Sequence, residues 1–371
     1  MDDRRASPQA DPRRTGWRGR LPAVLAASAA GLAACLVAAA PVAAHGPAPV
    51  DAPDAANLLL GWTFEPLPTL AIGAALIWWA WAVRRVNATH PANPVPRRRT
   101  VAFVVGMTAL ASALLSGIDR YDTTLFSVHM VQHVLLTLVA APLIALSGPI
   151  TLLLRAAGPE TRRGLLLPLL HARVTRFLAF PVVAWVVFAV VMWTSHFSPL
   201  FDAALEDPLV HELEHAAFLA AALLFWWPAL GVDPAPWRMA HPVRALYVFL
   251  QMTQNTLLAV VLVNATSVLY PHYATVQRAW GPSPFEDQQM AAAFMWVAGD
   301  LLFLAAIFGI LVGWSRAEAR DTARTDRRAA QELADIRVRE GRLAARRALE
   351  RGDARPDEPA LDAQPGSGAS R

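Results

Sequence analysis

Two pairs of histidines in this sequence have the spacing of metal ligands. His129 and His133 belong to the sequence HMVQH, and His211 and His215 belong to HELEH, so each pair is four residues apart. On a helix, side chains at positions i and i+4 lie on one face, with their Cβ atoms about 5–6 Å apart. Both pairs open apolar stretches, and polar groups inside such stretches are candidates for function. The sequence therefore predicts one metal site built from both pairs.

The residue types around these histidines favour copper. Neutral imidazole suits copper and zinc, affinity favours copper at an equal site, and thioether sulfur selects Cu(I). The only cysteine is Cys35, which excludes a multi-thiolate site. We predict transient copper binding, with Glu214 either as a ligand or as an acceptor that orients the imidazoles. The predicted ligands are His129, His133, His211 and His215, with His196, Met130 and Glu214 as further contributors.

Two other chemistries remain open for the same residues. HELEH also satisfies H-E-x-x-H, the zinc-protease helix in which the glutamate, here Glu212, is the general base. An intramembrane zinc metalloprotease is therefore the alternative, although it needs a third ligand on another helix and leaves the second histidine pair unused. A haem takes one histidine from each of two helices, so pairs one turn apart could serve one haem but not two.

The elements that must position these residues are membrane helices. The 371 residues are 55% hydrophobic, the mean hydropathy is +0.34, and the apolar residues fall in long blocks. Blocks of about 17–25 apolar residues are long enough to span a bilayer. We predict an all-α, polytopic membrane protein with seven transmembrane helices. The expected spans are residues 67–83, 101–118, 124–146, 177–195, 209–230, 243–264 and 289–313.

The distribution of charge predicts the orientation of these spans. Loops 84–100 and 147–176 each hold five arginines and at most one acidic residue. The segments that alternate with the Arg-rich loops together hold ten acidic residues and only Arg120 and Arg278. Because Arg-rich loops stay in the cytoplasm, we expect a bacterial plasma (inner) membrane protein with its mature N-terminus outside and its C-terminus cytoplasmic. The histidine pairs then lie at the outer face, and no nucleic-acid partner is expected.

The chain is expected to divide into four parts. Residues 1–44 have the basic start, the apolar run and the small-residue end of a signal peptide, or form an uncleaved extra helix. Residues 45–66 are an outer segment, and residues 67–314 are the seven-helix domain. Residues 315–371 are a charged cytoplasmic tail, helical to about Glu350 and then disordered.

Two carboxylates within the last span also have expected roles. Asp300 lies near the middle of that span, where a carboxylate needs partners. Gln251, Gln254 and Asn255 share one face of the preceding span and are its predicted partners. Asp287 is expected to cap the outer start of the last span.

These motifs resemble the CtaG family of cytochrome c oxidase assembly factors, which are associated with caa-type oxidases. The resemblance covers roughly residues 60–313. It implies a seven-span protein that is not an enzyme and that helps copper reach the catalytic subunit. The implied partners are cytochrome c oxidase subunits, a copper donor protein and membrane lipid. The motifs are HMVQH followed by Ala141-Pro142-Leu143, His211-x-x-Glu214-His215 with Phe225-Trp226-Trp227-Pro228, and Asp287-Gln288 leading to Met295-Trp296.

Overall fold

The computed structural model describes residues 49–351, and all regular structure within this range is helical. Six helical segments there are long and apolar enough to cross a membrane. A seventh span is the bent pair α12 (Pro181–Phe197) and α13 (Leu200–Glu206), so the predicted all-α membrane fold is confirmed. The six segments are α3 (Pro66–Thr89), α4 with α5 (Arg97–Tyr121), α6 to α8 (Phe126–Ala156), α14 (Pro208–Leu230), α15 (His241–Val263) and α17 (Pro284–Glu350).

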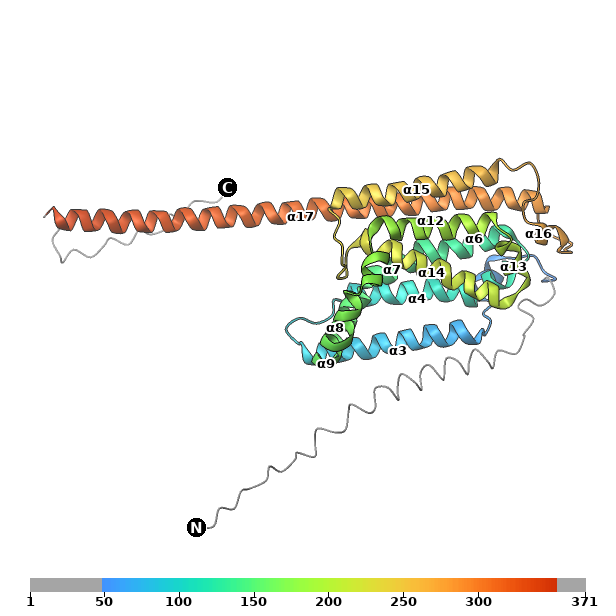
Figure 1. Ribbon diagram of the computed structural model, residues 1–371, viewed down its shortest axis with the longest axis horizontal. Helices are drawn as coiled ribbons and strands as arrows, with labels where there is room; N and C mark the ends of the chain where they lie inside the picture. The colour runs from blue at the N-terminus through green and yellow to red at the C-terminus, as the bar shows by residue number, and fades with distance from the viewer. Residues whose placement is uncertain (1–48, 352–371) are drawn as a thin grey trace, which may run out of the picture. The chain divides into compact units, whose positions relative to one another are not determined.

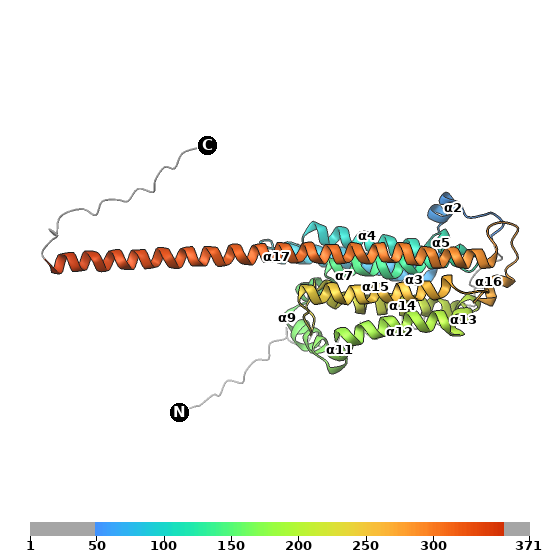
Figure 2. The same ribbon diagram turned by 90° about the horizontal axis from the view of Figure 1, so that it is seen from above.

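The spans form a bundle whose two ends are built differently. The short helices α13 and α16 (Pro271–Thr275) lie at one end, and α9 (Pro159–Thr161) lies at the other (Figure 1). Figure 2 shows the same separation from above. The predicted signal peptide, residues 1–44, lies outside the described residues.

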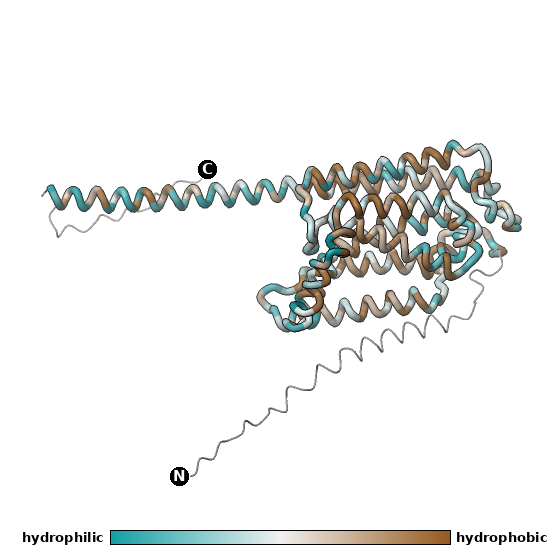
Figure 3. Tube along the Cα trace, in the orientation of Figure 1, coloured by the Kyte–Doolittle hydropathy of each residue, from teal (hydrophilic) through white to brown (hydrophobic). Residues whose placement is uncertain are grey.

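The surface of the spans is apolar over most of its length. Figure 3 shows hydrophobic residues along the helices and hydrophilic residues gathered at their ends and in the loops. Large side chains such as Val190, Phe249 and Leu304 are exposed, which is the composition expected of a surface in contact with lipid. The protein is therefore a multi-pass membrane protein.

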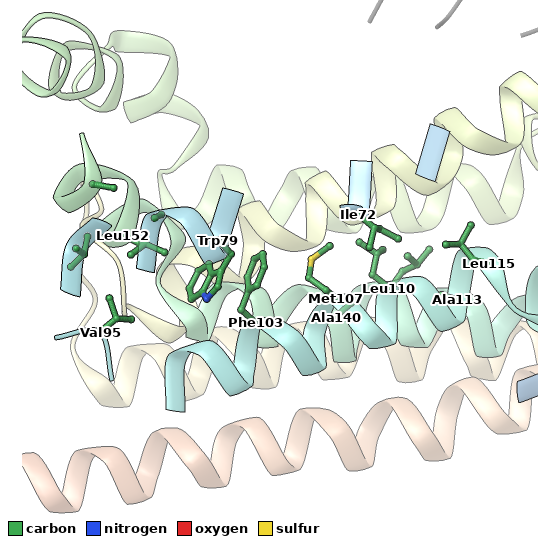
Figure 4. Packing of buried hydrophobic residues seen from close by; sticks show 14 residues of the cluster. Ile72, Trp79, Val95, Phe103, Met107, Leu110, Ala113, Leu115, Ala140 and Leu152 are labelled. Atoms are coloured by element: carbon green, nitrogen blue, oxygen red, sulfur yellow. The ribbon is translucent and has the colours of Figure 1, made fainter. Parts of the chain in front are cut away.

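Helices α3 and α4 pack through an aromatic stack. Trp79 lies flat on Phe103, with ring centroids 4.1 Å apart and an angle of 9° between the planes. Met107 and Leu110 continue this apolar contact along α4 toward α5, and Ala140 from the segment Leu135–Ala140 packs in the same cluster (Figure 4). In a membrane, such close packing holds helices together, because lipid gives no hydrophobic drive between them.

The break between α12 and α13 follows from a proline. Ser198 is extended, with φ −128° and ψ 164°, and Pro199 follows it. A residue before proline avoids the helical region, so the chain bends by 71° there. The bend sets α13 across the end of the bundle and places Phe201 5.0 Å from the ring of His129.

A π-helix interrupts the span that carries HMVQH. It covers Leu135–Ala140, directly after α6 (Phe126–Val134), and π-helical turns often occur at functional sites. Within it, the backbone carbonyl of Thr137 accepts a hydrogen bond from Trp226 Nε1 at 2.8 Å. Thr137 lies one turn after His133, so this contact holds the π-helix against α14 close to the first histidine pair.

Asp300 does have hydrogen-bond partners inside the membrane span. Asn255 Nδ2 donates to it at 3.4 Å, as predicted, and Thr256 Oγ1 donates at 2.9 Å. The prediction for the two glutamines was wrong, because Gln254 accepts from a tryptophan and Gln251 lies against the sulfur of a methionine. Gln251 lies one helical turn before Asn255 on the same face of α15, and packing decides which of these side chains meets Asp300.

The described chain divides into two compact units. The boundary falls within α17, between Ile310 and Leu311. The helix itself continues to Glu350, where the sequence predicted it to end.

Candidate metal centre

Five histidines come together in one buried cluster. His129 and His133 from α6 have ring centroids 4.3 Å apart, and His211 and His215 from α14 have centroids 4.2 Å apart. The two pairs meet through His129 and His211 at 5.8 Å, and His196 at the end of α12 lies 6.2 Å from His133. None of the five is more than 5% exposed. The structure thus brings both predicted pairs and His196 to one place.

A first set of candidate ligands consists of His129, His211 and Asp122. One ligand atom from each lies within 4.8 Å of the other two. Asp122 is in the turn between α5 (Gly117–Tyr121) and α6, is fully buried, and has Oδ2 3.4 Å from His211 Nε2. Burial, with repulsion from Asp119, raises the pKa of Asp122 well above its usual value. A cation at this position would favour the ionised carboxylate instead.

A second set consists of His129, His133 and Glu214. Their ligand atoms also lie within 4.8 Å of one another. Within the described residues, both ring nitrogens of His129 and of His133 and both carboxylate oxygens of Glu214 are buried without a hydrogen-bond partner. Burying polar atoms in this way costs about 1–3 kcal/mol per group. A bound metal ion would give each of the three side chains one partner. The two candidate ligand sets share His129.

A hydrogen bond fixes the tautomer of His196. Its Nδ1 lies 2.7 Å from the backbone carbonyl of Met192, which can only accept, so Nδ1 carries the proton. The lone pair is then on Nε2, which is buried without a hydrogen-bond partner in the described part of the chain. His196 is thereby prepared to act as a ligand on the His133 side of the cluster.

A glutamine fixes the tautomer of His215. Gln132 Nε2 donates to the carbonyl of Ala113 at 3.0 Å and to Asp119 Oδ1 at 3.1 Å, so its amide can have only one orientation. Its Oε1 therefore faces His215 Nε2 at 3.0 Å and accepts the imidazole proton. The lone pair of His215 is left on Nδ1. Such outer hydrogen bonds orient metal-binding histidines in many proteins.

Helix starts position both histidine pairs. Asp207 caps α14 by accepting from the backbone N–H groups of Leu209 and Val210, directly before HELEH. Helix α6 has no cap of its own, and Asp287 from α17 accepts from the backbone N–H of Phe126 at 2.6 Å. Asp287 lies in the first turn of α17, but among the described residues its carboxylate accepts only from α6. It therefore caps the helix that carries HMVQH and not, as the sequence predicted, the last span.

Three more carboxylates, those of Asp119, Glu65 and Glu212, lie near the cluster, and Asp119 contacts it through Gln132. Those of Glu65 and Glu212 lie close enough to Asp119 for their charges to repel it. Burial raises the pKa of Glu65, at the start of α3, above its usual value. A group of carboxylates of this kind attracts cations and raises their local concentration.

Met130 is the one predicted ligand that the structure surrounds with apolar side chains. It is fully buried in a cluster that includes Phe126, Met192 and Phe201. Its role as a sulfur ligand remains a prediction. Glu214, in contrast, shares a candidate ligand set with two of the predicted histidines.

Sequence reasoning missed Asp122 and Gln132. Asp122 counted only as an acidic residue of an outer loop. Gln132 lies inside HMVQH, beside His133, and its polar side chain within an apolar span was the signal that could have identified it.

The fold and the cluster together define a class: polytopic helical membrane proteins with a buried histidine and carboxylate site near one end of the bundle. The family model described as cytochrome c oxidase caa3 assembly factor (Caa3_CtaG) matches residues 77–317. The chain belongs to that family, which confirms the resemblance.

Two mycobacterial proteins are among the relatives, and both are described as uncharacterized. Protein Mb0105 of Mycobacterium bovis is 32% identical over 292 residues, and protein ML1998 of Mycobacterium leprae is 31% identical over 293 residues. Each match covers 76% of this chain but 44% of the relative, so the chain spans less than half the length of these proteins. No solved structure matches the chain.

Proposed function

We propose that this protein binds a copper ion at the histidine cluster and assists its delivery to the catalytic subunit of a caa3-type cytochrome c oxidase. The family assigns it to oxidase assembly. Copper is the cargo in this proposal, and the protein performs no catalysis. Its partners are the oxidase subunits, a copper donor protein and the surrounding lipid.

One observation carries the copper proposal. The imidazoles of His129 and His133 and the carboxylate of Glu214 are buried next to one another with no hydrogen-bond partners among the described residues. A cluster kept for packing alone would pair these atoms, since unpaired buried polar groups are costly. Imidazole ligands without any nearby thiolate suit copper better than other divalent ions of the same series. The metalloprotease alternative receives no support from the family.

The proposal places the cluster at the outer face of the membrane. Arginines in the loops at the opposite end support this orientation through the positive-inside rule. A copper donor outside the cytoplasm could then reach the site directly.

Copper binding by the purified full chain tests the proposal. Titration with Cu(I) against a competing chelator should give about one ion per chain. The H129Q/H133Q variant should lose at least about tenfold in affinity, because it removes one histidine shared by both ligand sets. The H90Q/H171Q variant is the matched control, since both of those histidines are exposed and lie outside the cluster. Equal affinity in all three proteins would refute the copper proposal.

A second experiment separates delivery from a scaffold role. Cells that lack the protein should lose oxidase activity, and added copper should restore part of it if delivery is the defect. Loss of activity that copper does not rescue would favour a scaffold role in assembly.

A further inference from the structure

A second polar site lies at the other end of the helices that carry the histidine cluster. It is a pocket of about 330 Å³, and its lining includes Arg99, Arg238 and Arg244. Arg99 is in the first turn of α4, whereas Ala113, which holds Gln132 of the cluster, is near its end. At 1.5 Å per residue, the two sites are roughly 20 Å apart along α4. The pocket is therefore separate from the metal centre.

Two glycines shape the pocket so that guanidinium groups fit at helix ends. Gly148 ends α7 (Ala141–Ser147) with φ 74°, and a Cβ there would lie 2.7 Å from Arg99 Nη1. Gly231 ends α14 with φ 57°, and a Cβ there would lie 2.5 Å from Arg244 Cζ. The positive φ and the close approach both require glycine. Each guanidinium thus lies directly over the C-terminal end of a helix.

The pocket has more positive charge than the protein itself balances. Its one acidic lining residue, Asp233, is buried and accepts from the backbone N–H groups of Ile150 and Thr151 at the start of α8 (Pro149–Ala156). Arg244 donates to two backbone carbonyls, and the charge of Arg238 is near enough to repel it. Helix ends attract these arginines but neutralise only part of their charge.

Two of the arginines have N–H donors that no protein acceptor uses within the described residues. Across the described residues, the guanidinium groups of Arg99 and Arg238 make no hydrogen bond to the protein, although each has five N–H donors. Trp237 lies at the rim, fixed by a hydrogen bond from its Nε1 to the carbonyl of Arg176. Tryptophan and arginine together are typical of the membrane interface, where lipid phosphates lie.

We propose that this pocket binds a phosphate group, supplied either by the headgroup of an anionic phospholipid or by free phosphate. Guanidinium forks match phosphate oxygens in pairs, and an anion between Arg238 and Arg244 would relieve their repulsion. Basic pockets between membrane helices are known to take phospholipid headgroups. A bound phosphate would connect α4, α8, α14 and α15, which contribute Arg99, Thr151, Pro228 and Arg244 to the lining. The proposal does not depend on copper binding.

Binding measurements on the full chain in a phosphorus-free maltoside detergent test this site. One arm titrates inorganic phosphate, and the other titrates short-chain phosphatidylglycerol, with diacylglycerol of the same chains as the neutral control. The R99Q/R238Q variant should bind at least about tenfold more weakly, since each lost charge-assisted hydrogen bond costs about that factor. Arg244 is left in place because it holds the end of α14.

The control variant is R97Q/R98Q, which removes the same charge from two exposed positions of the same helix turn. It should bind like the wild type. Binding of the lipid alone would assign a headgroup site, and binding of phosphate alone would assign a solute site. The proposal is overturned if neither phosphate source binds, or if R97Q/R98Q weakens binding as much as R99Q/R238Q does.

Discussion

Among single residues, Gln132 has the most specific effect on the cluster. Its amide is held by Ala113 and Asp119, and it leaves His215 with its lone pair on Nδ1. The imidazole is therefore oriented before any ion arrives. Pre-oriented ligands lose less conformational freedom on binding and bind more tightly.

Replacing Gln132 should weaken copper binding without removing a ligand. We expect Q132L to lower affinity about 10–100-fold, the usual range for lost outer-shell hydrogen bonds. Q132E keeps an acceptor for His215 and should lose less. Chelator competition measures both, and Q254L, which removes a glutamine bonded to Trp193 outside the cluster, is the control. Equal losses in Q132L and Q254L would exclude the orienting role.

Asp122 should make the stability of the metal-free protein fall as pH rises. Burial raises its folded pKa above the usual 3.8. Below that value the carboxyl is protonated in both folded and unfolded chains, so folding is not penalised. As pH rises, the unfolded chain loses the proton first, and the folded state becomes relatively less stable until pH passes the folded pKa.

Melting temperatures between about pH 4 and pH 8 test this expectation. D122N cannot ionise, so its stability relative to the wild type should increase with pH. D51N, which changes an exposed acid in the outer N-terminal segment, should follow the wild type. Parallel profiles for D122N and the wild type would contradict the role of buried charge.

The sequence predicted the histidines of the site but not their polar neighbours. The i, i+4 spacing places His129 with His133 wherever a helix forms, and the same holds for the second pair. Asp122 and Gln132 act through contacts between segments far apart in the chain, such as the bond from Gln132 to His215 across 83 positions. No local pattern encodes such contacts.

At the scale of elements, α6 depends on another helix for its first turn. Asp287 of α17 accepts from the N–H of Phe126, three residues before His129. The two segments are far apart in the sequence, which explains why the sequence assigned Asp287 only to its own helix. The position of HMVQH is therefore coupled to the docking of the last span.

D287A should destabilise the protein and loosen the first histidine pair. Loss of a helix cap costs about 0.5–2 kcal/mol, so the melting temperature and the copper affinity should both fall. E286A is the control, because that neighbouring exposed carboxylate accepts only from Ser283 in its own turn. A D287A protein with normal copper affinity would show that the cap does not position the site.

Apolar length predicted α14 and α15 to within two residues at each end, whereas the last block continues as α17 to Glu350, well beyond its expected end. The breaks were harder to predict. The π-helix at Leu135–Ala140 ends just before Pro142, which cannot donate to Leu138 and so disturbs the α-helix, but the proline alone does not predict a π-helix. The bend at Pro199 has a local cause, but its 71° angle depends on the packing of Phe201.

At the scale of the molecule, the first unit has opposite charges at its two ends. Glu65, Asp119 and Glu212 lie near one another at the end with the histidine cluster, and arginines line the pocket at the other end. The acidic end draws in cations, and the basic end suits anionic groups. The family match begins at residue 77 of this unit and ends at residue 317, just beyond its boundary, whereas the relatives extend well beyond this chain.

E65Q/E212Q should slow copper uptake more than it weakens binding at equilibrium. Removing two negative charges lowers the local cation concentration. High salt should reduce the difference in uptake rate between the variant and the wild type, because salt screens the electric field. Stopped-flow uptake at low and high salt measures this. E318Q/E340Q removes the same charge from the second unit and should leave the rate unchanged. An uptake rate in E65Q/E212Q equal to the wild type at low salt would exclude steering.

The sharing of His129 between two ligand sets also bears on how fast an ion could leave. An ion held by His129, His133 and Glu214 could acquire His211 and Asp122 before losing its first ligands, because His129 stays bound throughout. Stepwise exchange of this kind has a low barrier even where total affinity is high. Tight retention and rapid hand-over, which conflict in a closed single-ion cage, are therefore compatible in this cluster.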